Sequence, residues 1–113
     1  MPNIDPLESV IEKAVCEYAK RLGCLVYKFT SPARRSVPDR LFVMPYGKGV
    51  FFIEFKRKGG KPTAAQEVEI NKILAQGTRA FVACSIAEGK KIVDDVLRDA
   101  PSYPSQKLTL ADF

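Results

Sequence analysis

The sequence predicts a single α/β domain in which helices flank a mixed β-sheet, with the element order α-β-β-β-α-β followed by a C-terminal helix. Three segments carry apolar residues at helical spacing, and four short apolar runs are bounded by glycine, proline and serine. A chain of 113 residues can build one hydrophobic core. We therefore expect residues 1–100 to form the domain, and residues 101–113, which are rich in proline and serine, to form a tail.

The first helix has signals at both ends. Asp5 suits an N-cap and Pro6 suits the first helical position. Apolar residues then follow helical spacing from Leu7 to Leu22, and Gly23 provides a stop. The pattern predicts a helix that begins directly after Asp5.

A strand, a basic loop and a hairpin follow this helix. The pattern predicts a strand over 25–30, a loop over 31–38, and two strands over 40–44 and 50–56. The segment 45–49 contains a proline and two glycines and is a strong hairpin signal.

The second half of the chain alternates helix and strand. Thr63 is followed three residues later by Gln66, which predicts a capping box and a helix to about residue 76. A strand is expected over 79–84. Ser85 and Glu88 form a second candidate capping box, which opens a helix to about residue 99.

The composition excludes several classes of site. The chain has no histidine, which removes imidazole-based triads and histidine-ligated zinc. Its three scattered cysteines suggest neither a disulfide framework nor a thiolate zinc site. A metal would have to be held by oxygens, which favours Mg²⁺ or Mn²⁺. No organic cofactor is expected.

The net charge of +5 permits a nucleic-acid partner. No apolar run approaches the roughly 18 residues of a membrane span. The N-terminus lacks the basic region and apolar core of a secretory signal. We therefore expect a cytoplasmic protein without a membrane partner.

The hairpin brings acidic residues together. Side chains two apart on a strand point to the same face, so Glu54 and Lys56 lie side by side. If the turn centres near residue 47, Asp39 lies across from Glu54 or Phe55, within roughly 5 Å. Two such carboxylates repel each other unless a cation bridges them or one is protonated. Two acids, a divalent cation and a lysine are the parts that phosphodiester hydrolysis needs.

These residues resemble a known family. Pro38-Asp39, the hairpin and Glu54-x-Lys56 resemble the PD-(D/E)xK nucleases, which have a restriction-endonuclease-like core. The wider text over 28–40, 52–56 and 61–66 resembles the virus-type replication–repair nuclease (VRR-NUC) domain in its stand-alone, phage-like form. The resemblance implies a bacterial or phage-encoded DNA endonuclease that depends on Mg²⁺ or Mn²⁺. It further implies a homodimer that acts on branched or four-way DNA in repair. Ala33 and Ser36 depart from the glycines usual in this loop.

The resemblance also implies further site residues. The Phe55 carbonyl would be a metal ligand, and an acid of the first helix would complete the site. The family pattern selects Glu12, whereas the helical wheel alone favours Glu8. Gln66 would steady Lys56 or the attacking water, although its capping-box position offers an alternative role. The expected catalytic residues are therefore Asp39, Glu54, Lys56, Gln66 and Glu12, and the expected metal ligands are Asp39, Glu54, Phe55 and Glu12.

Basic and polar residues flank the acids on both sides and would offset the repulsion between carboxylates and DNA. They are Lys28, Ser31, Arg34, Arg35, Arg40, Arg57, Lys58 and Lys61. Two other functions remain open: a non-catalytic DNA-binding module on the same fold, and an RNA or nucleotide hydrolase. For the homodimer, the candidate contacts are the helix after Ser85, exposed faces of the first helix, and the tail with its apolar Leu108, Leu110 and Phe113.

Overall fold

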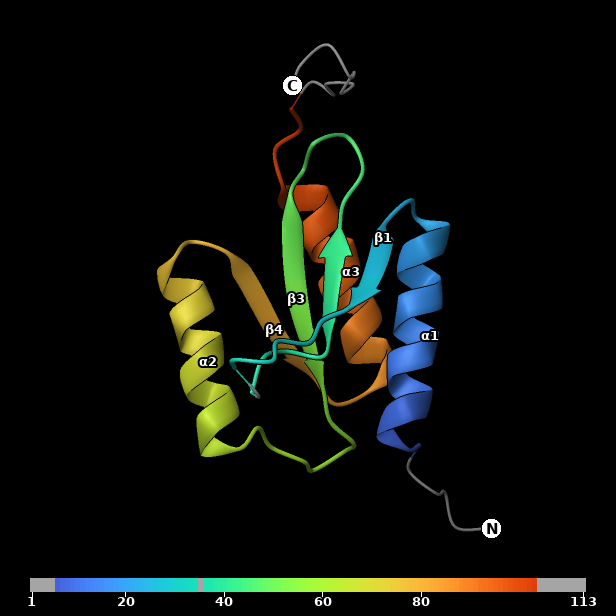
Figure 1. The fold of residues 1–113 in the computed structure, drawn as a ribbon. Helices are drawn as coiled ribbons and strands as arrows, with labels where there is room; N and C mark the ends of the chain where they lie inside the picture. Colours follow the sequence, from blue (N-terminus) through green and yellow to red (C-terminus); the bar gives the residue numbers. More distant parts are fainter. Residues whose placement is uncertain (1–5, 35, 104–113) are drawn as a thin grey trace, which may run out of the picture.

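The computed structural model describes residues 6–34 and 36–103 and confirms the predicted element order (Figure 1). The elements are α1 (Glu8–Arg21), β1 (Leu25–Lys28), β2 (Arg40–Val43), β3 (Val50–Phe55), α2 (Ala64–Ala75), β4 (Arg79–Ala83) and α3 (Ile86–Asp99).

The four strands form one mixed sheet in the order β1-β2-β3-β4. β1, β2 and β3 pair antiparallel, whereas β4 pairs parallel to β3. The parallel pair needs a crossover connection, which α2 provides. Helices α1 and α3 pack together against one face of the sheet, and α2 lies on the other side (Figure 1).

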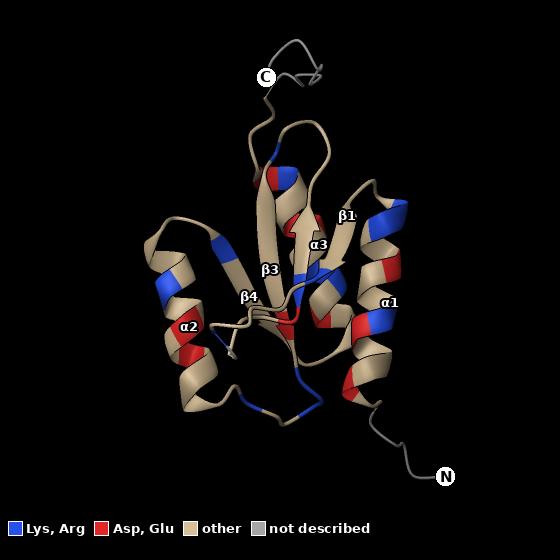
Figure 2. Cartoon of the chain, viewed as in Figure 1, with Lys and Arg blue, Asp and Glu red and all other residues tan. Residues whose placement is uncertain are grey.

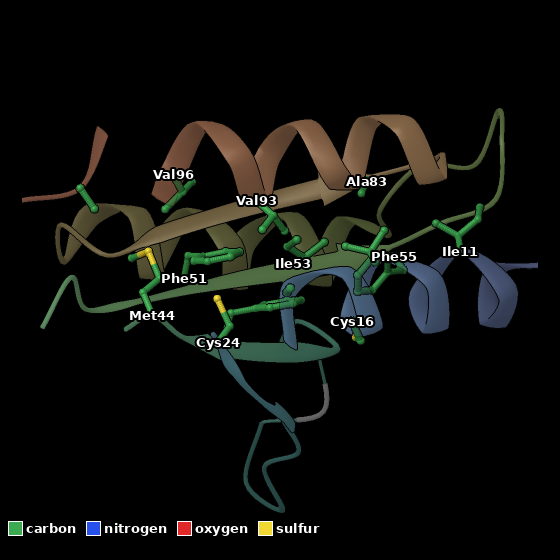
Figure 3. Packing of buried hydrophobic residues seen from close by; sticks show 14 residues of the cluster. Ile11, Cys16, Cys24, Met44, Phe51, Ile53, Phe55, Ala83, Val93 and Val96 are labelled. Carbon is green, nitrogen blue, oxygen red and sulfur yellow. The ribbon is translucent and has the colours of Figure 1, made fainter. Parts of the chain in front are cut away.

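The core lies between the sheet and the pair α1 and α3 (Figure 3). The alternate residues Phe51, Ile53 and Phe55 of β3 all point into it and are fully buried. Phe42 of β2 stacks on Phe51 with ring centroids 4.7 Å apart. Because the pleat alternates, the side chain of Glu54, which lies between Ile53 and Phe55, points to the opposite face. The face of β3 opposite Glu54 is thus wholly apolar.

Helices α1 and α3 approach closely at Gly89. A Cβ atom added at Gly89 would lie 2.4 Å from Cγ2 of Val15. Only glycine fits this contact, so Gly89 sets how closely α3 can pack on α1.

The hairpin has the predicted register. Arg40 pairs with Ile53 and Val43 with Val50. The turn closes with a hydrogen bond from the Lys48 N–H to the Pro45 carbonyl at 3.3 Å. This register sets Asp39, the residue before β2, opposite Glu54.

The predicted starts of α2 and α3 are confirmed, whereas that of α1 is not. Thr63 and Gln66 form the expected capping box of α2, and the Ser85 side chain accepts from the Glu88 N–H at the start of α3. The predicted start of the first helix is wrong. Leu7 is the N-cap and has an extended backbone (φ −63°, ψ 153°), so the helix begins at Glu8, and among the described residues its N-cap makes no side-chain hydrogen bond.

In the part of the chain that the structure describes, no helix is both long and apolar enough to cross a membrane. The tail residues Leu108, Leu110 and Phe113, which were candidate dimer contacts, lie outside the described residues.

Candidate metal centre

Three carboxylates meet near the C-terminal end of β3. Glu8, Asp39 and Glu54 each place an oxygen within 4.8 Å of the others. Glu8 comes from the first turn of α1, Asp39 from the residue before β2, and Glu54 from β3. The N-terminal end of α1, which carries a partial positive charge, stabilises acids at this point.

Asp39 is held by the main chain of the neighbouring strand. Its Oδ2 accepts a hydrogen bond from the Phe55 N–H at 2.9 Å. This bond fixes the Asp39 carboxylate beside Glu54, as the hairpin register predicted. Phe55 therefore has a defined role through its N–H, whereas its carbonyl as a metal ligand stays a prediction.

Glu54 is the buried member of the cluster, with only 1% of its surface exposed. Its burial, followed by the adjacent charge of Asp39, raises the pKa of Glu54 to about 8, although Lys56 acts in the opposite direction. Its Oε1 atom is buried and has no hydrogen-bond partner among the described residues. A buried carboxylate oxygen without a partner is costly unless something binds it.

A divalent cation fits this arrangement. Three carboxylates supply oxygen ligands of the kind that Mg²⁺ and Mn²⁺ prefer, and the unpartnered Oε1 of Glu54 offers a free ligand position. A bound cation would also offset the burial and the repulsion from Asp39, the two effects that raise the pKa of Glu54 most.

The structure groups Glu8, rather than Glu12, with the other two acids. Glu12 lies one turn further along α1, where its Oε1 accepts from Nε of Arg40 in a partly buried ion pair. The helical wheel, which favoured Glu8, thus agrees with this geometry, and the family pattern, which selected Glu12, does not.

Gln66 plays two roles at once. Its Oε1 accepts from the Thr63 N–H at 2.9 Å and completes the capping box. Its Nε2 donates to Oε2 of Glu54 at 3.3 Å. Both contacts coexist because the amide carries its acceptor and its donor on different atoms.

Lys56 lies on the same face as Glu54, as predicted. Its Nζ is 3.6 Å from Oε2 of Glu54, and 17% of its side chain is exposed. The ammonium is thus next to the carboxylates and still reachable from solvent.

Most of the basic and polar residues predicted to bind DNA belong to two groups. Lys28, Ser31 and Arg34 line a hollow of about 370 Å³ whose wall also includes Asp39 and Glu12. Arg57, Lys58 and Lys61 are exposed and follow β3 in the chain. Figure 2 shows basic residues on the link between β3 and α2.

Two of the predicted DNA-binding arginines already have protein partners. Arg40 pairs with Glu12, and Arg34 NH1 lies 3.1 Å from both carboxylate oxygens of Glu69 on α2. Glu69 was not expected at the site. Its place on the same helical face as Gln66, three residues away, is the signal that could have indicated it. Arg35 lies outside the described residues.

The mixed sheet, its helical layers and the element order define a restriction-endonuclease-like α/β core. Comparison with known proteins narrows this class. No protein-family model matches the chain. A protein of Acyrthosiphon pisum secondary endosymbiont phage 1, named "Putative nuclease p44", is 43% identical over 75 residues, which are 66% of this chain and 80% of that protein.

Solved structures agree. A structure named "VRR_NUC domain" is 30% identical with a TM-score of 0.68, over 81% of this chain and 95% of the other. A second, "VRR_NUC domain protein", is 17% identical with a TM-score of 0.71, over 84% and 91%, and shows the shared fold. The chain belongs to the VRR-NUC family.

Proposed function

We propose that this protein is a divalent-metal-dependent DNA endonuclease. The observation that carries the proposal is Glu54, which belongs to a cluster of three carboxylates beside Lys56 and whose buried Oε1 has no hydrogen-bond partner among the described residues. Membership of the VRR-NUC family and the nuclease name of the phage relative support the same activity.

Glu8, Asp39, Glu54 and the Phe55 carbonyl would hold Mg²⁺ or Mn²⁺. When bound, the ion would polarise the phosphoryl oxygen and lower the pKa of a water. The protein's own groups have separate tasks. The Phe55 N–H orients Asp39, Gln66 orients Glu54, and the Lys56 ammonium offsets negative charge that develops on the phosphate.

DNA is the proposed substrate, and branched or four-way DNA is the proposed preferred form. The basic loop and the link after β3 support binding to a phosphate backbone on either side of the acids. Paired cuts across a four-way junction need two active sites related by two-fold symmetry, which a homodimer would supply. We further propose a cytoplasmic protein whose domain spans residues 1–100.

Cleavage assays test the activity. With Mn²⁺, we expect four-way and flapped DNA to be cut faster than linear duplex, single-stranded DNA or RNA, and EDTA to abolish cutting. Asp39→Asn and Glu54→Gln should each be at least about a hundredfold slower, because each removes a charge from the metal site. Asp99→Asn, which removes an exposed acid of α3, is the matched control.

Four outcomes would contradict the proposal in whole or in part. Full activity of Asp39→Asn or Glu54→Gln would refute the metal site, and binding of DNA without cleavage under any divalent ion would favour a non-catalytic module. Faster cutting of RNA would instead favour an RNA hydrolase.

Light scattering at micromolar concentration checks the homodimer, and a monomer would contradict it.

A further inference from the structure

A second hollow adjoins the one that contains Asp39. It has a volume of about 490 Å³ and lies between α1 and the ends of β1 and β2. Glu12 and Lys28 line both hollows, so the two meet at these side chains. The second hollow along α1 therefore adjoins the first one, which contains Asp39 of the carboxylate cluster.

The second hollow is basic. Lys13 and Lys20 of α1 and Lys28 and Arg40 of the strands line it, against the two acids Glu12 and Glu17. Glu12 and Arg40 neutralise each other in their ion pair. Lys13, Lys20 and Lys28 are exposed and form no ion pair within residues 6–34 and 36–103. Three available ammonium groups thus surround one available carboxylate.

The spacing of the lysines matches a nucleic-acid strand. Lys13 and Lys20 are seven residues apart, which places them on one side of α1 and separates them by roughly 10 Å along the helix axis. A stacked strand rises roughly 3.4 Å per nucleotide, so this separation corresponds to roughly three nucleotides. An ordinary solvated helix face would also carry charges, but this one lines a hollow that shares Glu12 and Lys28 with the hollow containing Asp39.

We infer that the hollow along α1 binds the backbone of one DNA strand as it leaves the metal centre, with Lys13 and Lys20 as phosphate contacts. The inference rests on the proposed nuclease function and deepens it, because it names where the strand beyond the scissile phosphate lies. On this inference the DNA strand in the hollow is distinct from the strand that contacts Arg57, Lys58 and Lys61. The carboxylate cluster lies between the two strands.

Binding without cleavage tests the inference. Fluorescence anisotropy of a labelled oligothymidylate is measured in EDTA over a series of NaCl concentrations. Lys13→Gln with Lys20→Gln should weaken binding about tenfold and lower the salt slope by about 1.4, since each contact to a single strand contributes about 0.7. Lys91→Gln with Arg98→Gln removes the same charge from the exposed face of α3 and should leave the slope unchanged.

A second variant changes affinity in the opposite direction. Glu17→Gln removes the available acid of the hollow and should tighten binding a few-fold, whereas Asp99→Asn should not. Equal effects of the α1 and α3 variants would overturn the inference, because net charge alone would explain them. An unchanged slope in the Lys13 and Lys20 variant would overturn it as well.

The two proposals fail in different ways. If the Lys13 and Lys20 variant keeps the original salt slope while cleavage still depends on Asp39, the inference about the hollow is wrong and the proposed nuclease activity stands. A retained salt-slope effect in a protein that cuts no DNA would support the hollow as a nucleic-acid site and overturn the nuclease.

Discussion

Gln66 joins Glu54 to the start of α2: the amide nitrogen of Gln66 donates to Oε2 of Glu54 at 3.3 Å, while its amide oxygen caps the helix. The candidate site and the helix terminus thus share one side chain. Because both ends of the amide are used, Gln66 has one orientation that satisfies both contacts.

Paired substitutions separate the two roles of Gln66. Gln66→Ala should lose about 1 kcal/mol of stability and, because Glu54 loses a donor, about tenfold or more in cleavage rate. Thr63→Ala disrupts the same capping box and should lose similar stability with little loss of rate. Chemical denaturation and cleavage assays measure both quantities. Equal rate losses would show that the contact with Glu54 does not contribute.

Calorimetry with Mn²⁺ decides between the two acids of α1. Glu8→Gln should weaken metal binding at least about tenfold, because the structure groups Glu8 with Asp39 and Glu54. Glu12→Gln should bind metal nearly as well as the unmodified protein and should lose about 1 kcal/mol of stability, since Arg40 loses its partner. The reverse order of metal affinities would contradict the geometry and support the family pattern.

The stability of the metal-free protein should fall as the pH rises. The pKa of Glu54 is about 8 in the folded protein, against an ordinary value of 4.5, so the unfolded chain loses this proton first. The stability associated with protonated Glu54 is present below about pH 4.5 and is lost as the pH rises through about 8. Urea unfolding in EDTA at pH 5 and pH 9 measures this change.

Glu54→Gln provides the control for this pH dependence. The glutamine side chain cannot ionise. The stability of this variant relative to the unmodified protein should therefore be higher at pH 9 than at pH 5. Mn²⁺ should restore stability at pH 9 only where Glu54 is present. Parallel pH profiles of the two proteins would contradict the raised pKa.

Gly89→Ala should destabilise the fold although alanine is the better helix former. The added Cβ would lie 2.4 Å from Val15 Cγ2, and overpacking of this kind costs about 1–3 kcal/mol. Val15→Ala in the same chain should recover part of the loss, because it removes the clashing methyl group. A double-mutant cycle by urea unfolding measures this coupling. If the losses of stability in the two single variants simply add in the double variant, the contact between Gly89 and Val15 is not the cause of the destabilisation.

The sequence predicts features that depend on local signals. The hairpin register follows from the turn at 45–49 and the strand period, and it correctly places Asp39 opposite Glu54. The capping box of Thr63 and Gln66 is likewise local. The choice between Glu8 and Glu12 depends instead on how α1 is rotated about its axis against the sheet, and this rotation is set by packing.

Other features depend on contacts between distant segments. The ion pair of Arg34 with Glu69 joins residues 35 positions apart, and that of Arg40 with Glu12 joins residues 28 positions apart. Charge alone does not say which acid each arginine meets. The start of α1 differs from these cases, because its signal at Asp5 and Pro6 was local and the helix nevertheless begins at Glu8, after the extended Leu7.

The bond from the Phe55 N–H to Asp39 gives the site a built-in spectroscopic reporter. Most amide protons of a strand donate to a carbonyl, which carries no formal charge. This proton donates to a carboxylate, so its chemical shift follows the charge and position of Asp39. A nitrogen–proton correlation spectrum of labelled protein would therefore report cation binding through one resonance of the main chain, without any change to the sequence.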